Sequence, residues 1–285
     1  MKLFATGCAL AAAKLDIPTK EIRPGVHMPV VSIGTWVQGS KETENSTAIV
    51  GAWMDLGGRG VDTAWDYFDQ PAVAKAIADH GVDRKDVFIT TKIPACVGKG
   101  EAAKLVDADL KQLNTDYLDL VLVHMPLGFD CDGTWAALEE ALKANKTRSI
   151  GVSNFRKSNL QSLLKKATVI PAVNQIGYSV FGHNEDTIQF CRQNNITVEA
   201  YSPLGSPGRG GKSVFTDPTV TGIATRMNVT AAQVALRWIV QRGDVLTVLS
   251  SNKDHQSNDA DLFAFKLEDD DVAALDKIQE QVVVV

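Results

Sequence analysis

The chain has 285 residues, of which 45% are hydrophobic and 22% are charged, and its formal net charge is −5. These values are ordinary for a globular enzyme, and the length suits either two small domains or one large α/β barrel. Lysines and arginines are scattered, and no apolar run approaches the ~20 residues that cross a bilayer, which argues against nucleic-acid and membrane partners.

Residues 1–19 precede the first regular pattern and allow two interpretations. The segment MKLFATGCALAAA has Lys2, an uncharged run and small residues near its end, which is the shape of a short secretory signal. The alternative is an arm that lies on the domain surface. Four N-x-S/T sequons fit export but arise easily by chance. They begin at Asn45, Asn145, Asn195 and Asn228.

From residue 30 onward, short aliphatic runs alternate with stretches of helical spacing. The runs cover 30–35, 60–64, 87–91, 118–123, 149–153, 171–175, 197–202 and 246–250. The stretches with an apolar residue every three or four positions include 101–113, 134–145, 158–167, 184–194 and 230–242. Asn184 and Thr230 stand where helix N-caps are favoured. Eight buried parallel strands alternating with helices predict a closed (β/α)8 TIM barrel over residues 20–285. No G-x-G-x-x-G follows the first strand, so a Rossmann domain is not expected.

The cysteines show no C-x-x-C pair, which argues against both a zinc site and a disulfide framework. We interpret them as buried or incidental thiols. They are Cys8, Cys96, Cys131 and Cys191.

A polar side chain stands at or just past the end of one predicted strand after another. In a barrel, the carboxyl ends of the strands converge on one mouth, where catalytic loops lie. The residues in this position are Asp62, Lys92, His124, Asn154, Gln175 and Tyr201. A lysine at a barrel rim needs a carboxylate to be tolerated, and Asp62, one strand over, is the natural partner of Lys92.

Tyr67 follows Asp62 by five residues, so a turn can bring its hydroxyl over the same mouth. A free phenol has a pKa of about 10, and a nearby lysine ammonium is expected to lower it. His124 can donate a hydrogen bond to a carbonyl oxygen. The set suits delivery of a proton to oxygen while a hydride reaches carbon. It lacks an activated Ser or Cys nucleophile and an H-x-H or carboxylate cluster for a metal.

Eight segments, in order, resemble the landmarks of the aldo-keto reductase family. They are GTW (34–36), DTAWDY (62–67), ITTK (89–92), LVHMP (122–126), IGVSNF (150–155), VNQ (173–175), AYSPLG (200–205) and AQVALRW (232–238). The resemblance covers roughly residues 20–267 and implies a barrel without a Rossmann domain that binds NADP(H), with NAD(H) as the alternative. It also implies a catalytic tetrad with Tyr67 as general acid, made of Asp62, Tyr67, Lys92 and His124.

The resemblance implies further binding residues. Ser153, Asn154 and Gln175 would hold the nicotinamide carboxamide, Tyr201 would stack on the ring, and Ser202 and Leu204 would contact the pyrophosphate. Trp36 and Met125 would line the substrate pocket. Some of these residues also have a possible purely structural role. Ser153 and Asn154 are also placed to cap a helix near Lys157, and Tyr201 to wedge under a turn.

The chain departs from the family pattern at the cofactor's phosphate. The family segment reads Pro-Lys-Ser with an arginine about five residues on, and these cations pair with the 2′-phosphate of NADPH. Here the lysine position falls at Ser250, and the arginine position at His255 or Gln256. Ser251 and Asn252 can donate hydrogen bonds and Lys253 can substitute as a cation, so we predict a weakened preference for NADPH. The alternative is that Lys253 and His255 lie on a solvated helix start.

Other departures, such as HMP where the family often has His-Trp-Pro, predict an open, shallow pocket for small or varied carbonyl compounds. We expect a monomer in the cytoplasm.

Two other function classes stay open. One is a non-enzymatic, cofactor-sensing subunit, which the intact tetrad disfavours. The other is a barrel enzyme with Lys92 as a Schiff-base amine, which the Asp62 partner disfavours because such an amine must be substantially neutral.

Overall fold

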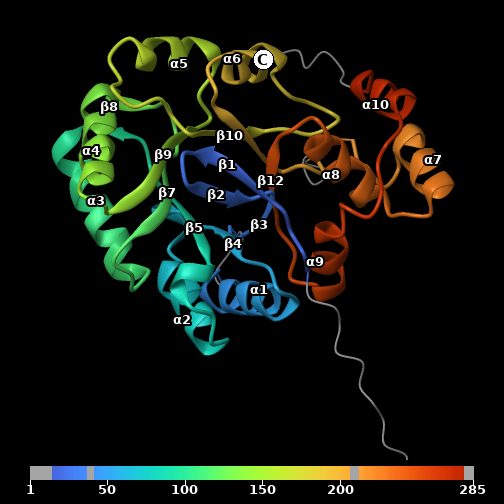
Figure 1. The fold of residues 1–285 in the computed structure, drawn as a ribbon, viewed down its shortest axis with the longest axis horizontal. Helices are drawn as coiled ribbons and strands as arrows, with labels where there is room; N and C mark the ends of the chain where they lie inside the picture. Colours follow the sequence, from blue (N-terminus) through green and yellow to red (C-terminus); the bar gives the residue numbers. More distant parts are fainter. Residues whose placement is uncertain (1–14, 37–41, 206–211, 279–285) are drawn as a thin grey trace, which may run out of the picture.

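The computed structural model describes residues 15–36, 42–205 and 212–278 of the 285-residue chain. Eight parallel strands close into a barrel in the order β3-β4-β5-β7-β9-β10-β11-β12 (Figure 1). Their bounds are Val31–Gly34, Gly60–Asp62, Phe88–Ile93, Leu118–Val123, Thr147–Ser153, Val173–Gly177, Thr197–Tyr201 and Val245–Val248. Each overlaps a run expected from the sequence, so the prediction of a (β/α)8 barrel is confirmed.

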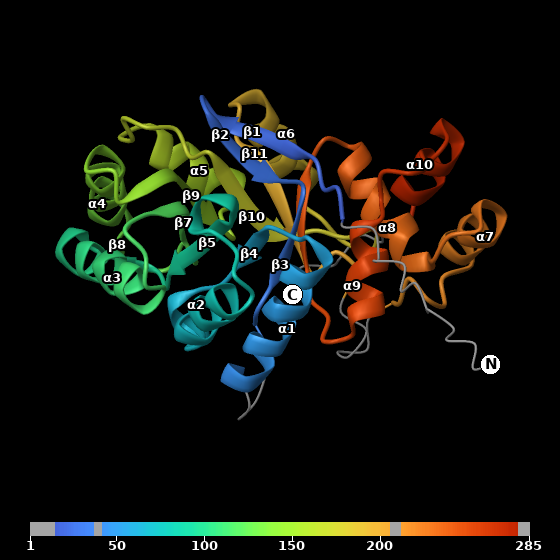
Figure 2. The same cartoon turned by 60° about the horizontal axis from the view of Figure 1, so that its bottom comes forward.

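Helices surround the barrel as a ring, because each connection between parallel strands must return along the outside. The ring consists of α1 (Glu42–Leu56), α2 (Gln70–Asp79), α3 (Lys99–Gln112), α4 (Cys131–Lys143), α5 (Lys157–Leu164), α6 (Glu185–Gln193), α8 (Ala231–Gln241) and α9 (Lys253–Ala260). Two further helices, α7 (Pro218–Met227) and α10 (Asp269–Asp276), pack against each other at the periphery, beyond α8 (Figure 2). Two 3-10 helices, η1 (Trp65–Tyr67) and η2 (Arg84–Asp86), follow β4 and precede β5.

The helix starts follow the capping residues expected from the sequence. The Asn184 side chain accepts a hydrogen bond from the backbone N–H of Thr187 at the start of α6. The Thr230 hydroxyl accepts one from Gln233 N–H at the start of α8, and the Gln233 side chain accepts one from the Thr230 N–H in return. These reciprocal bonds satisfy N–H groups that the first helical turn leaves without partners.

A β-hairpin covers the amino-terminal opening of the barrel. Its strands β1 (Thr19–Arg23) and β2 (Val26–Pro29) pair antiparallel and lie across the barrel in Figure 1. The Lys20 ammonium donates to the carbonyl of Gly243, two residues before β12, at 2.6 Å. Met28 is fully buried and packs with Leu120 and Leu122 in the barrel interior. With this end covered, the carboxyl ends of the strands remain for a binding site.

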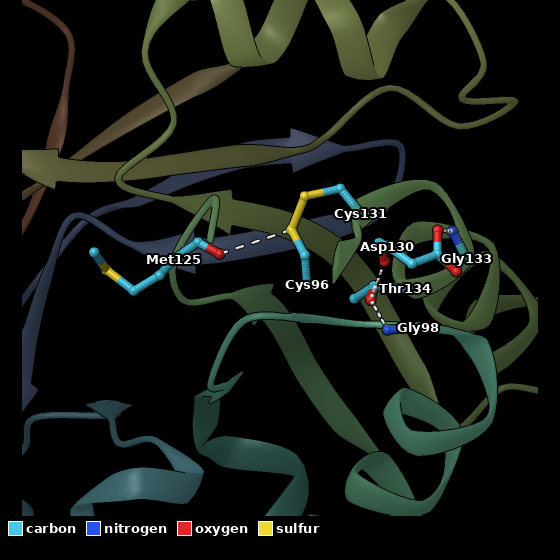
Figure 3. The surroundings of a disulfide bond; sticks show 7 residues. All are labelled: Cys96, Gly98, Met125, Asp130, Cys131, Gly133 and Thr134. Carbon is cyan, nitrogen blue, oxygen red and sulfur yellow. Dashed lines mark hydrogen bonds between the residues drawn. A yellow bond between two sulfur atoms is a disulfide. The ribbon is translucent and has the colours of Figure 1, made fainter. Parts of the chain in front are cut away.

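The prediction that the cysteines are unpaired thiols is wrong for two of them. Cys96 and Cys131 form a disulfide (Figure 3), whereas Cys191 is a buried free thiol and Cys8 lies outside the described residues. Spacing in the sequence could not show this pair, because 35 residues separate the two positions. The pairing arises because β6 (Cys96–Val97) lies beside β8 (Gly128–Asp130), the strand that leads into α4.

The short β6–β8 sheet ties together the loops that follow β5 and β7. The backbone N–H of Cys96 donates to the Leu127 carbonyl at 2.7 Å, and His124 N–H donates to the Ile93 carbonyl at 2.8 Å. The Cys96–Cys131 disulfide adds a covalent link between the same two loops. The main chain just past Lys92 and His124 is therefore held on both sides.

The structure bears only in part on the expectations for the N-terminus and for membrane spans. Residues 1–14 of the possible signal or arm lie outside the described residues. Among residues 15–36, 42–205 and 212–278, no helix combines the length and apolarity that a membrane span requires.

We predict that replacing Cys131 by Ser lowers the free energy of unfolding by about 3–4 kcal/mol, the loop-closure entropy for this separation. Urea denaturation of the wild type and variant measures the difference. A reductant should lower the midpoint of the wild type and leave that of Cys131→Ser unchanged. Equal midpoints for oxidised wild type, reduced wild type and variant would contradict a stabilising role for the bond.

Candidate active site

The polar residues predicted at the strand ends form one connected group at the carboxyl end of the barrel. Asp62 is the last residue of β4, Lys92 is the fifth residue of β5, and His124 directly follows β7. Ser153 ends β9, Gln175 lies in β10 and Tyr201 ends β11. Hydrogen bonds link these residues across the barrel from one strand to another.

Lys92 and Asp62 form a buried ion pair. The ammonium is fully buried and lies 2.6 Å from Asp62 Oδ1, and it also donates to the carbonyl of Thr63 at 2.9 Å. Burial alone would lower the pKa of Lys92, but the charge and hydrogen bond of Asp62, together with the charges of Tyr67 and Glu199, raise that pKa above its ordinary value. The lysine is therefore a fixed cation, which argues against a Schiff-base amine.

Tyr67 is brought over the ion pair by η1. Its hydroxyl lies 3.4 Å from Lys92 Nζ, and the ammonium is 4.9 Å from the ring centroid. The turn is anchored from beneath by the buried Asp69, whose two oxygens accept from Thr63 Oγ1 at 2.6 Å and Ser46 Oγ at 2.8 Å. Phe68, in the left-handed region at φ 56°, ends the turn.

The expected lowering of the Tyr67 pKa is wrong in sign. Burial raises the pKa of Tyr67 above its ordinary value, and the opposing effect of the Lys92 ammonium is smaller. The sequence showed the nearby lysine but not how little solvent reaches the phenol. Tyr67 is thus a protonated phenol at neutral pH, and the ammonium beside it stabilises the phenolate that would form on proton loss.

Gln175 connects the ion pair to a carboxyl group that sequence reasoning missed. Its amide Nε2 donates to Asp62 Oδ2 at 2.8 Å and to Glu199 Oε2 at 2.9 Å. Glu199, in the middle of β11, is fully buried. Burial and the Asp62 charge raise the pKa of Glu199 to about 8. A charged residue within the apolar run TVEAYS was the one signal that could have drawn attention to it.

Asn154 joins the histidine side of the group to Tyr201. Its Nδ2 donates to the His124 carbonyl at 3.0 Å, and its Oδ1 accepts from the Tyr201 hydroxyl at 2.8 Å. The Ser153 hydroxyl donates to the carbonyl of Gln175 at 2.9 Å. Neither Ser153 nor Asn154 caps α5, because the N-cap position of that helix is Arg156. The helix-capping alternative is therefore excluded.

The Tyr201 ring lies close to the backbone of β10. A Cβ added at Gly177 would meet the Tyr201 ring at 3.4 Å, an ordinary van der Waals contact. Ser202 follows in the left-handed region at φ 50° and its carbonyl accepts from Gly205 N–H, while Leu204 is half-buried. The residues that follow, 206–211, lie outside the described residues.

The two predicted substrate residues follow different barrel strands, β3 and β7. Trp36 follows β3 and is 50% exposed, which fits an aromatic wall that a ligand could cover. Met125 follows His124, and its sulfur lies 3.2 Å from Asn154 Nδ2. Figure 3 shows the Met125 side chain extending away from the disulfide, while its carbonyl faces Cys96.

His124 also makes a side-chain contact that the sequence did not predict. Asp66, the middle residue of η1, places Oδ1 at 3.1 Å from His124 Nδ1. The rings of His124 and Tyr67 meet edge to face with centroids 5.8 Å apart. The acid directly before Tyr67 in DTAWDY was visible in the sequence, but nothing there indicated which side chain it would meet.

The segment predicted to bind the cofactor phosphate begins α9. Asn252 is its N-cap, and Oδ1 accepts from the N–H groups of Asp254 and His255. Ser250 Oγ accepts from Asn252 N–H at 3.1 Å, and Ser251 is exposed. The helix start thus holds these polar side chains close together, where its N–H groups favour an anion.

The two candidates for the lost arginine position differ in exposure. Gln256 is fully buried and donates to the carbonyls of Ile49 and Ser250, so it faces inward. His255 is exposed. Lys253 is 52% exposed and pairs with Asp55 Oδ2 at 3.3 Å, so it lies on a solvated helix start but is not without contacts.

Known proteins with similar sequences and structures agree with this arrangement of the site. Residues 30–280 match the model of the aldo/keto reductase family. The chain is 35% identical to the protein REDOX 2 of Catharanthus roseus, over 94% of this chain and 90% of that protein. It is also 35% identical to a morphine 6-dehydrogenase of Pseudomonas putida, over 92% and 91% of the two chains.

Among solved structures, the chain is similar to a silkworm (Bombyx mori) aldo-keto reductase crystallised with NADPH. The two share 30% identity and a TM-score of 0.88 over 94% of this chain and 89% of that one. A matching family model over most of the barrel, together with relatives aligned nearly end to end, places this chain in the aldo-keto reductase family.

Proposed function

We propose that the chain is a carbonyl reductase that uses NADP(H), in which Tyr67 gives a proton to the oxygen of an aldehyde or ketone. The observation that carries the proposal is the Tyr67 hydroxyl at 3.4 Å from the buried Lys92 ammonium, which Asp62 in turn fixes at 2.6 Å. Relatives support the reaction class. A glycerol 2-dehydrogenase of Saccharomyces cerevisiae with NADP(+) in its name is 34% identical, and the silkworm enzyme binds NADPH.

The residues beside the ion pair suit a nicotinamide. A planar carboxamide needs donors and acceptors, for which Asn154, Gln175 and Ser153 would exchange some of their present hydrogen bonds. A flat ring needs an apolar face such as that of Tyr201. When bound, the reduced nicotinamide supplies the hydride. We propose that Ser202 and Leu204 contact the pyrophosphate and that Trp36 and Met125 line the carbonyl pocket.

Residues of the protein supply the proton and stabilise the anion that its transfer leaves behind. Burial raises the pKa of Tyr67, so the phenol enters the reaction with its proton in place. Transfer of that proton to the carbonyl oxygen leaves a phenolate beside Lys92. The ammonium favours this anion, and Asp62 prevents Lys92 from losing its own charge. His124 orients the carbonyl by donating a hydrogen bond to its oxygen.

We infer that the enzyme acts as a monomer, as membership of the aldo-keto reductase family suggests. For the compartment, resemblance to cytosolic reductases supports the cytoplasm, whereas the Cys96–Cys131 disulfide is typical of an oxidising environment. The cytoplasm therefore stays a prediction, and a cleaved secretory segment at the N-terminus stays the alternative.

Replacing Tyr67 by Phe should lower the rate of NADPH oxidation with a reactive aldehyde by about 10²–10⁴, the usual effect of losing a general acid. Phe keeps the ring that packs near Lys92, so the NADPH dissociation constant should stay within about twofold of the wild type. Stopped-flow kinetics and fluorescence titration measure the two quantities. Near-wild-type turnover in Tyr67→Phe would show that another group donates the proton.

The Lys253–Asp55 pair leads to a prediction about cofactor preference. An exposed ion pair is worth about 0.2–1 kcal/mol, so Asp55→Asn should release Lys253 and tighten NADPH binding by about two- to fivefold. NADH has no 2′-phosphate, so its dissociation constant should not change. Lys253→Ala should weaken NADPH alone. Equal changes for both cofactors in either variant would place Lys253 away from the phosphate.

A further inference from the structure

Asp66 and His124 make a contact that the proposed reaction does not by itself require. Asp66 Oδ1 lies 3.1 Å from His124 Nδ1, and the carboxylate is 43% exposed while the imidazole is 16% exposed. Asp66 directly precedes Tyr67 in η1, so one short turn presents both the proposed acid and a carboxylate to the same histidine. Burial alone would raise the pKa of Asp66, but the hydrogen bond and charge of His124 lower it, so the group is a carboxylate at neutral pH.

A carboxylate can only accept hydrogen bonds, which fixes what Nδ1 must carry. A hydrogen bond between His124 Nδ1 and Asp66 Oδ1, which lie 3.1 Å apart, therefore requires the proton to be on Nδ1. A neutral ring with its one proton on Nδ1 has a lone pair on Nε2, and a lone pair repels a carbonyl oxygen. Only the doubly protonated imidazolium has an N–H on Nε2 as well. The Asp66 contact therefore couples the charge of His124 to its ability to donate toward a substrate.

The other ionisable groups near His124 do not offer the same partner. Lys92 and Asp62 are engaged with each other across β5 and β4. Tyr67 meets the imidazole only edge to face, from η1. Within the part of the chain that the structure describes, Asp66 is the carboxylate in hydrogen-bond contact with His124.

We propose that Asp66 is a positioning residue that holds the proton on His124 Nδ1, so that His124 donates to the substrate carbonyl only as an imidazolium. The proposal rests on the proposed carbonyl reductase function. It requires carbonyl reduction to be weaker when the His124 ring carries one proton than when it carries two. Tyr67 adds a decline at higher pH, because burial raises its pKa above the ordinary value.

The first test reads the histidine directly and needs no activity. The ¹⁵N shifts of an imidazole distinguish Nδ1–H, Nε2–H and doubly protonated rings, and His124→Gln assigns the signal among the five histidines. In the wild type, Nδ1 of His124 should be protonated at pH 7. In Asp66→Asn the Nδ1-protonated fraction should fall, because an amide can donate to Nδ1 as readily as accept from it. A wild-type neutral ring with its proton on Nε2 would overturn the proposal.

The second test measures kcat/KM for a reactive aldehyde between pH 6 and 10. Asp66→Asn should lose about tenfold at pH 7, the difference between a charge-assisted and a neutral hydrogen bond. Its decline with rising pH should be shallower than in the wild type, and its NADPH dissociation constant should be unchanged. Asp79→Asn removes a carboxylate of similar exposure (50%), paired with Lys75, and serves as the matched control with wild-type kinetics.

The two tests separate the proposal from the function on which it rests. A wild-type profile in Asp66→Asn would overturn the role of Asp66 and leave carbonyl reduction intact. If the wild type reduced no aldehyde, the proposed function would fail, while the imidazole shifts would still decide whether Asp66 sets the protonation of His124. Because Asp66 is partly exposed, circular dichroism of Asp66→Asn should match the wild type.

Discussion

The buried ion pair between Lys92 and Asp62 is the interaction on which the rest of the site depends. A fully buried ammonium is costly unless a carboxylate and further acceptors compensate for lost hydration. Asp62 at 2.6 Å and the Thr63 carbonyl at 2.9 Å provide them. This pair keeps a positive charge beneath Tyr67 in a place that water does not reach. In the proposed reaction, the ammonium is the group that stabilises the phenolate left after Tyr67 gives up its proton.

The barrel places these groups by geometry that is independent of the chemistry. Parallel strands end at the same face, so consecutive units deliver Asp62, Lys92 and His124 to one mouth. The β1–β2 hairpin closes the opposite end, and the β6–β8 sheet with its disulfide holds the loops after β5 and β7. The rigid scaffold thus carries the charges, and the turn η1 adds Tyr67 and Asp66 from the side.

The sequence predicted features that follow from a repeated pattern, such as the strands, but not features that depend on a single contact between distant residues. Aliphatic runs located all eight barrel strands, since burial on both faces requires continuous apolar residues. The Cys96–Cys131 bond was missed because it depends on which loops lie side by side. Glu199 was missed because its partner, Gln175, belongs to another strand. The sequence did not show which of His255 and Gln256 faces the solvent, because this depends on the residue at which α9 begins.

The electrostatics of the site were predictable in part. The pairing of Lys92 with Asp62 followed from the cost of burying a charge, and the contacts agree with it. The direction of the Tyr67 pKa did not follow, because it is the balance between two large opposing effects, burial and the nearby ammonium. A list of neighbours gives the sign of each effect but not which one is larger.

The central claim is that Lys92 and Asp62 act on the reaction through Tyr67. A double-mutant cycle in kcat/KM tests it most directly, with Tyr67→Phe as one change and Asp62→Asn with Lys92→Met together as the other, so that no unpaired charge is left buried. If the ion pair works only by favouring the Tyr67 phenolate, adding Tyr67→Phe to the charge-free variant should cost less than about twofold. A further loss of about 10² or more, as for a general acid acting alone, would show that the ion pair and the phenol act independently.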